Sequence, residues 1–402
     1  MTPLVASPDG GGERRRLGIV AALGSSQTLA WASSYYLVAI LADPMARDLG
    51  ISVTHVFAAF STALLIGAVI GPRVGRTIDA FGGREVLAAS NLIFAAGLAA
   101  LAWAPSVSVF WLAWFVIGFA MGLGLYDSAF AALGRIFGEG ARSAITGVTL
   151  IAGFASTIGW PLTTWGEAEL GWRLTCAAWA GAHILIGLPL NLFALPKLRT
   201  AAAKAAAAVK AHIPMDRTMW LLGFAFAAVW FVATGMAAHL PRVLAAAGAS
   251  TTEAVAAAAL VGPAQVAARV LEASFLSRFH PIVSARLSTV VHPIGAALLL
   301  WGGGFLAMPF TILHGAGTGI QTIARGTVPL AVYGSENYGY RLGLLGAPAR
   351  IAQAAAPLAF GVLIARYGAD ALLLSTALCA CSMLALLAVR PRPSSVAPNA
   401  PV

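Results

Sequence analysis

The sequence predicts an all-α membrane protein with twelve transmembrane helices in two pseudo-symmetric six-helix halves. Three observations predict this fold class. The 402-residue chain is 59% hydrophobic and only 10% charged, whereas soluble domains carry roughly 25% charged residues. Apolar runs of about 20 residues, long enough to cross a hydrocarbon core of about 30 Å, recur along the whole chain. Short motifs of the first half also reappear in the second half at a nearly constant offset.

The apolar runs between polar breaks predict twelve spans. They cover residues 17–41, 53–74, 84–103, 107–137, 143–165, 173–195, 218–243, 253–275, 283–303, 305–333, 342–365 and 370–389. Only APSV separates the third span from the fourth, and only GGGF separates the ninth from the tenth. We therefore expect two tight hairpins at these places.

The distribution of lysine and arginine predicts the orientation in the membrane. With the N-terminus in the cytoplasm, eighteen of these residues fall in cytoplasmic segments, and the opposite face holds only Arg47, Arg173, Arg242 and Arg366. Cytoplasmic loops carry such an excess of positive charge. We expect a multi-pass protein of the bacterial inner membrane with both termini in the cytoplasm. The net charge of +10 is then explained by loops facing anionic lipid rather than by nucleic-acid binding.

Internal repeats divide the chain. Gly138 and Gly334, Gly147 and Gly343, and Pro161 and Pro357 are each separated by 196 residues, which favours two homologous halves. The expected organisation is a cytoplasmic tail (1–16), a first six-helix half (17–196), a basic cytoplasmic linker (197–217), a second half (218–389) and a cytoplasmic tail (390–402).

The connector between the second and third spans, GRTIDAFGGREVL, combines charge and glycine at an unusual density. Gly75, Asp79, Gly82 and Arg84 match the pattern Gly-x-x-x-Asp-(Arg/Lys)-x-Gly-(x)-Arg-Arg. In this connector, and in its twelve spans, two halves and long central linker, the sequence resembles the major facilitator superfamily of secondary transporters. Three positions depart from the pattern: Ala80, Gly83 and Glu85 stand where basic residues are usual. The equivalent connector of the second half, EASFLSRFHPIVSA, does not show it.

Two roles are open for this connector. Asp79 can accept hydrogen bonds from the N-terminal amides of a neighbouring helix, or pair with an arginine of the other half. Either contact would make a latch that holds one conformation. Alternatively, the arginines only anchor the loop in the cytoplasm. We favour the latch, because anchoring requires neither the aspartate nor the paired glycines Gly75 and Gly82.

The resemblance implies a transporter that works as two halves around a central cavity, lined by spans one, four, seven and ten. It implies a small-molecule solute, protons and the lipid bilayer as partners, no nucleic acid, no cofactor or metal, and a monomer. In span one, Gln27, Trp31 and Tyr35 share a face and are candidate cavity residues, although aromatic residues in a membrane helix also serve packing.

Four charged side chains lie well inside apolar runs: Asp127, Arg269, Arg325 and Arg350. A charge near the centre of a membrane helix costs at least about 2.5–3.5 kcal/mol, so such residues face the bundle interior or a wet cavity. Asp127 is the only carboxylate deep in a span. It can carry a proton, or it can form a permanent ion pair with Arg325 or another buried cation, and the sequence leaves both readings open.

Polar residues follow a helical spacing in three further spans. In span ten, His314, Thr318, Gln321 and Thr322 share a face with Arg325, which predicts a wet or ligand-lined stripe; hydrogen bonding between helices is the alternative. In span eleven, Gln353 follows Arg350 by three residues.

In span eight, Gln265, Arg269 and Glu272 share a face. Gln265 is a candidate cavity residue. Arg269 and Glu272 lie near the cytoplasmic end of the span and can pair with each other, so we expect them to have a gating or structural role.

Three buried arginines against one buried aspartate favour transport of a small anionic or carboxylate-bearing solute, with Asp127 as the proton carrier. The alternative is efflux of drugs or amphiphiles through an aromatic cavity of Trp31, Tyr35, Tyr126 and Trp160. A non-transporting sensor or an enzyme is disfavoured, because the sequence shows no catalytic constellation and no soluble domain.

Overall fold

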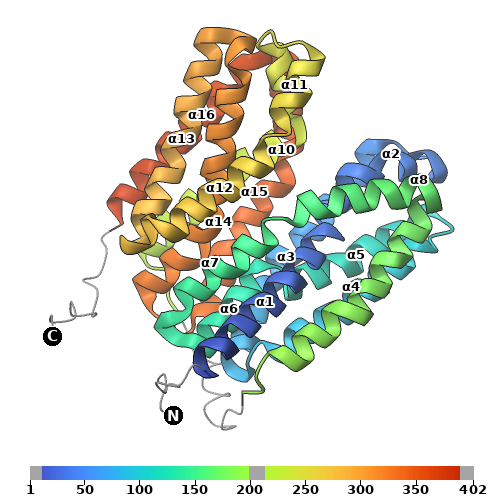
Figure 1. Cartoon of the computed structure of the whole chain (residues 1–402). Helices are drawn as coiled ribbons and strands as arrows, with labels where there is room; N and C mark the ends of the chain where they lie inside the picture. The colour runs from blue at the N-terminus through green and yellow to red at the C-terminus, as the bar shows by residue number, and fades with distance from the viewer. Residues whose placement is uncertain (1–10, 199–212, 390–402) are drawn as a thin grey trace.

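The computed structural model describes residues 11–198 and 213–389, and within them all regular secondary structure is helical (Figure 1). The first half of the chain forms α1 (Gly11–Ala32), α2 (Leu37–Leu49), α3 (Val53–Phe81), α4 (Arg84–Ala102), α5 (Val107–Gly124), α6 (Tyr126–Phe137), α7 (Ala141–Ala152) and α8 (Ala155–Ala182), followed by two π-helical turns, His183–Gly187 and Leu190–Ala194. The second half forms α10 (Arg217–Ala246), α11 (Thr251–Ala258), α12 (Val261–Ser274), α13 (Pro281–Gly302), α14 (Ala307–Tyr333), α15 (Tyr338–Tyr367) and α16 (Ala371–Ala388).

Within residues 11–198 and 213–389, seven helical segments are long and apolar enough to cross a membrane. Four of them, Val107–Ala194, Thr251–Ser274, Pro281–Tyr333 and Tyr338–Ala388, contain more than one helix. Divided at their kinks and hairpins, and taken with α1 and α2, the seven segments are consistent with the twelve-span fold. The predicted fold class is therefore confirmed.

The first helix begins within the predicted N-terminal tail (1–16). α1 starts at Gly11 and includes Arg14, Arg15 and Arg16. Arg16 holds this first part of α1 against the start of α7. Its guanidinium donates to the Gly140 carbonyl at 2.7 Å and contacts the Ser143 hydroxyl. Most of the predicted linker (197–217) and the predicted C-terminal tail (390–402) lie outside the described residues.

Several spans are broken near their middle, and the sequence explains where. Between α1 and α2, Ser33 and Ser34 each donate a hydroxyl to the carbonyl four residues earlier, a bond that competes with the helical ladder and bends helices. Between α5 and α6 the break falls at Leu125, directly after Gly124. Between α11 and α12 it falls just before Pro263, which has no N–H to continue the helix.

The two halves lie side by side, with the first half blue to green and the second yellow to red in Figure 1. They meet along α3 and α15, where Gly71 and Gly75 face Gly339 and Gly343. A Cβ atom on Gly343 would lie 2.5 Å from the Gly71 carbonyl oxygen, so only glycine permits this approach. The halves diverge toward the end that carries α2 and α11 (Figure 1). We call the opposite end, where α3 is followed by α4, the Asp79 end.

Candidate functional site

Asp127, Arg325 and Arg350 form a buried ion cluster at the boundary between the halves. Asp127 Oδ2 lies 2.7 Å from Arg325 Nη2 and 2.6 Å from Arg350 Nη2. The three residues are only 7%, 8% and 6% exposed. Two guanidinium groups face one carboxylate, so the cluster keeps an unbalanced positive charge, which is costly away from water. The second carboxylate oxygen, Oδ1, is buried without a hydrogen-bond partner among the described residues.

The break in span four positions Asp127. Asp127 lies in the first turn of α6, directly after Leu125, and the N-terminal end of a helix stabilises a carboxylate. Gln27 of α1 holds this break, because its Nε2 donates to the Gly124 carbonyl at 2.6 Å. That carbonyl needs a partner from outside, since α5 ends there. Gln27 thus supports the half-helix of Asp127, and it is not among the residues that line the adjacent cavity.

A small cavity adjoins the ion cluster. It is lined by Trp31, Tyr35, Leu64, Leu125, Tyr126, Asp127, Arg325, Arg350 and Gln353. The Trp31 ring lies 4.9 Å from the Tyr126 ring and 5.2 Å from the Tyr35 ring. Tyr35 also reaches the other half, with its hydroxyl 3.2 Å from that of Thr234 in α10. A cavity lined by both positive charge and aromatic rings suits a small anion with a flat or apolar part.

Glycines let the cluster pack closely. Arg350 Nη1 donates to the Gly67 carbonyl of α3 at 3.2 Å, and a Cβ on Gly71 would lie 3.0 Å from the same nitrogen. A Cβ on Gly346 would lie 2.6 Å from Asp127 Oδ2. The Arg325 guanidinium also lies 5.5 Å from the centre of the Trp230 ring, a cation–π distance.

Asp79 links the halves at its own end of the bundle. Its two carboxylate oxygens accept from the backbone amides of Gly339, at 2.9 Å, and Tyr340, at 2.8 Å. These amides belong to the first turn of α15, where N–H groups have no partner within the helix. Arg76 stacks on the Tyr340 ring at 3.9 Å. The carboxylate therefore caps a helix of the opposite half.

Glu272 makes a second link at this end. It pairs with Arg142 of α7 at 3.5 Å and accepts from the Ser284 hydroxyl at 3.3 Å. The expected pair between Arg269 and Glu272 is not formed, because Arg269 turns toward the first half.

Arg269 donates to the Thr149 carbonyl, to Gln265 and to the Thr322 hydroxyl, at 3.3–3.4 Å. The residue is 4% exposed, and no carboxylate lies within ion-pair distance of it in residues 11–198 and 213–389.

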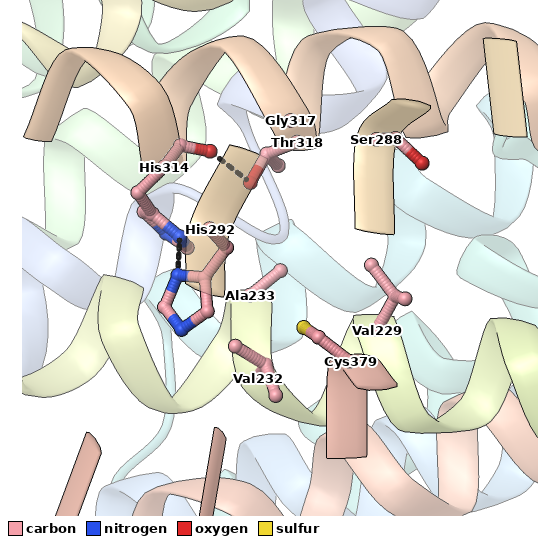
Figure 2. Close-up of a pocket in the computed structure, with 9 residues that line it drawn as sticks. All are labelled: Val229, Val232, Ala233, Ser288, His292, His314, Gly317, Thr318 and Cys379. Atoms are coloured by element: carbon pink, nitrogen blue, oxygen red, sulfur yellow. Dashed lines mark hydrogen bonds between the residues drawn. The ribbon is translucent and has the colours of Figure 1, made fainter. Parts of the chain in front are cut away.

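A second cavity lies inside the second half, between α10, α13, α14 and α16, and Figure 2 shows its lining. His314 Nδ1 lies 3.0 Å from His292 Nδ1, and His292 Nε2 lies 2.8 Å from the Ser375 hydroxyl. Gln321 also turns into this half, where it accepts from Ser288 at 2.6 Å. These bonds join α13, α14 and α16 to one another and do not reach the central cavity.

The structure thus divides the predicted site residues into three groups. Asp127, Arg325, Arg350, Trp31 and Tyr35 meet at the central cavity. Gln27 and Gln321 make contacts between helices instead, and Gln265 accepts from Arg269 of its own helix. The stripe predicted on span ten therefore splits among different neighbours. Gly75, Asp79, Glu272 and Arg269 lie at contacts between the halves, while Arg84 donates within the first half to the Leu192 carbonyl at 2.7 Å.

Sequence reasoning missed two features. Arg142, the partner of Glu272, looked like one more loop arginine, and nothing in its neighbourhood marks it. The glycines of α3 and α15 could have been found: Gly67, Gly71 and Gly75 recur every four residues, as do Gly339 and Gly343. This small-xxx-small spacing is typical of closely packed membrane helices.

Residues 23–312 match the profile of the Major Facilitator Superfamily. No curated protein matches the sequence significantly. Among solved structures, the human organic anion transporter MFSD10 is similar with a TM-score of 0.69 at 16% identity, covering 95% of this chain and 99% of that one. The proton:xylose symporter XylE bound to 6-bromo-6-deoxy-D-glucose gives 0.68 at 15%, covering 93% and 95%. FucP in the outward conformation gives 0.70 at 15%, covering 93% and 99%. At these identities the likeness concerns the fold alone.

Proposed function

The chain belongs to the Major Facilitator Superfamily, and from that premise we propose that it is a secondary transporter of a small organic anion, coupled to protons. The observation that carries the proposal is the ion cluster. Asp127 neutralises only one of two buried arginines, so a bound anion removes the remaining unbalanced charge.

We propose an inner-membrane location with the Asp79 end in the cytoplasm. Arg76, Arg84, Arg135 and Arg142 gather at that end, as expected for cytoplasmic segments. Both termini are then cytoplasmic. In this orientation the latches of Asp79 and Glu272 close the cytoplasmic side. In the proposed cycle, the halves then rock about the central site, which opens the cytoplasmic side.

Competition between the substrate and Asp127 provides the coupling. At present, one oxygen of Asp127, Oδ2, contacts both Arg325 and Arg350. A carboxylate substrate can take its place and bind these guanidinium groups with two parallel hydrogen bonds. Asp127 then gives up both of its positive partners, and a proton carried on Asp127 replaces the positive charge that they supplied. Anion binding and proton uptake therefore support each other, and the pair crosses together.

The test is transport in proteoliposomes, with and without an imposed pH gradient, using a panel of small carboxylates. We expect gradient-driven accumulation by the wild type. Asp127→Asn should abolish accumulation and spare substrate exchange, because the neutral amide imitates the protonated acid. Arg325→Ala should abolish both accumulation and exchange. Arg350→Lys should retain only part of the wild-type activity, since lysine cannot form the two parallel hydrogen bonds of a guanidinium group. Accumulation by Asp127→Asn equal to that of the wild type would rule out Asp127 as the proton carrier.

Efflux of drugs or amphiphiles remains the second candidate, favoured by the rings of Trp31, Tyr35 and Tyr126 at the cavity. Trp160 contributes less than expected, because it is 43% exposed and does not line the cavity. This candidate predicts transport of lipophilic cations or neutral dyes, unchanged in Arg325→Ala. That result, with no carboxylate transported, would replace the anion proposal.

A further inference from the structure

Two buried polar atoms of the central cavity have no hydrogen-bond partner among the described residues, and they are of opposite kinds. Asp127 Oδ1 is an acceptor, and the Trp31 indole Nε1 is a donor. Both residues line the same small cavity. A buried polar group without a partner is costly, and the indole N–H of a buried tryptophan usually finds one.

Position within the cavity distinguishes Trp31 from the other tryptophans. Trp114 and Trp230 also have a buried indole nitrogen without a partner in the described residues, but neither lines the cavity. The Trp31 ring packs against the rings of Tyr126 and Tyr35, and these contacts fix its position at the cavity.

A hydroxyl group matches both atoms at once. It donates one hydrogen bond, which Asp127 Oδ1 can accept, and it accepts others, which the Trp31 N–H can donate. With the Asp127 proton carried on Oδ2, Oδ1 remains an acceptor, so a carbonyl or a second carboxylate could satisfy only the tryptophan, and a methyl group neither.

We propose that the transported anion is a short hydroxycarboxylate, whose carboxylate binds Arg325 and Arg350 and whose hydroxyl bridges Trp31 Nε1 and Asp127 Oδ1. The inference rests on the proposed function, because it takes the arginines as the carboxylate site. It adds that Trp31 selects the substrate through its N–H group, beyond the packing of its ring.

Binding of three three-carbon acids to the purified protein, measured by calorimetry, tests the proposal. Lactate has the hydroxyl, pyruvate a carbonyl and propionate neither. We expect lactate to bind about tenfold or more tightly than propionate, in keeping with the usual cost of unpaired buried groups, and pyruvate to bind more weakly than lactate. Trp31→Phe keeps an aromatic ring and removes the N–H. It should reduce the preference for lactate over propionate to about threefold or less.

Trp114→Phe is the matched control, since it removes an equally buried and unpartnered N–H away from the cavity. It should leave the preference intact. A melting temperature of Trp31→Phe close to that of the wild type shows that the variant is folded. Equal binding of lactate and propionate by the wild type would overturn the hydroxyl inference and leave the anion proposal standing. A preference for lactate that survives Trp31→Phe would overturn the role of Trp31. Binding of none of the three acids would overturn the anion proposal and this inference with it.

Discussion

Glu272 of α12 lies 3.5 Å from Arg142 of α7, and the glutamate is completely buried. The two residues belong to different halves of the molecule. Arg142 also donates to the carbonyls of Phe279, at 2.7 Å, and Leu276, at 3.4 Å. One arginine thus holds the whole connector between α12 and α13 against the first half.

This contact corresponds to the one that Asp79 makes. Asp79, near the end of α3, binds the first turn of α15, and Glu272, near the end of α12, binds a side chain from the first turn of α7. Adding the repeat offset of 196 to Arg142 gives Tyr338, the first residue of α15. Each half therefore supplies one acidic residue that reaches the equivalent helix start of the other half, although the second connector lacks the sequence pattern of the first.

Removing the Glu272 charge should open the Asp79 end. In Glu272→Gln the buried link to Arg142 loses its charge, and hydrogen bonds to charged groups contribute about 1.5–3 kcal/mol. We expect the population with separated halves to rise about tenfold. Pulsed electron paramagnetic resonance measures this separation as the distance between spin labels attached at the exposed positions Glu139 and Glu336. Glu85→Gln, which removes an exposed charge at the same end, should leave the distances unchanged. Identical distance distributions in Glu272→Gln and wild type would mean that the contact does not hold the halves.

A methyl group added between α3 and α15 should also separate the halves at the Asp79 end, because it would clash with the facing helix. In Gly75→Ala the new Cβ would overlap the Gly339 carbonyl, whereas a Cβ on Gly140 meets nothing within 4 Å. We expect Gly75→Ala to lengthen the distance between the labels and to lower the maximal transport rate at least tenfold. Gly140→Ala, at the same end of the molecule, should behave as wild type. A fully active Gly75→Ala would show that the close approach is dispensable.

The hydrogen bond of Gln27 should matter for positioning Asp127. Gln27→Leu leaves the buried Gly124 carbonyl without a partner, at a cost of about 1–3 kcal/mol. We expect a lower melting temperature and a maximal rate reduced about tenfold, with propionate or lactate affinity changed less than threefold because Gln27 does not line the cavity. Thr62→Val, in α3, removes a hydroxyl bonded to the Ala58 carbonyl of its own helix and should change neither rate nor affinity. A large loss of affinity in Gln27→Leu would instead indicate contact with the substrate.

The sequence predicted those features of the fold and the site that depend on the composition and periodicity of long stretches. The spans follow from apolar runs, because a membrane demands about 20 apolar residues for each crossing. The charged residues Asp127, Arg325 and Arg350 could be singled out for the same reason: each is expensive in its span, so each needs a partner inside the bundle.

The partners themselves could not be predicted, because they depend on how two halves face each other. Periodicity shows that Gln321 and Arg325 share a side of α14, but a side of a helix about 100° wide touches more than one neighbour. Gln321 therefore reaches Ser288 within its own half, while Arg325 reaches Asp127 in the other. The same limit explains Arg269 and Glu272: their spacing permits a pair on one helix, yet each finds a partner in the first half.

Arg269 should act on the conformational change and not on substrate recognition. It is buried, does not line the central cavity, and donates to the Thr149 carbonyl near the C-terminal end of α7, where the helix dipole favours a cation. Arg269→Gln keeps a hydrogen-bond donor but loses this charge, which should weaken contact between the halves. We expect a longer distance between the labels at the Asp79 end, a reduced maximal rate, and a ratio of lactate to propionate affinity within twofold of the wild type. Arg325→Gln provides the contrast, since loss of a cavity arginine should abolish binding of both acids. If Arg269→Gln also abolishes their binding, then Arg269 is a third anion-binding residue, and its contact with Thr149 is only the resting position of a group that meets the substrate.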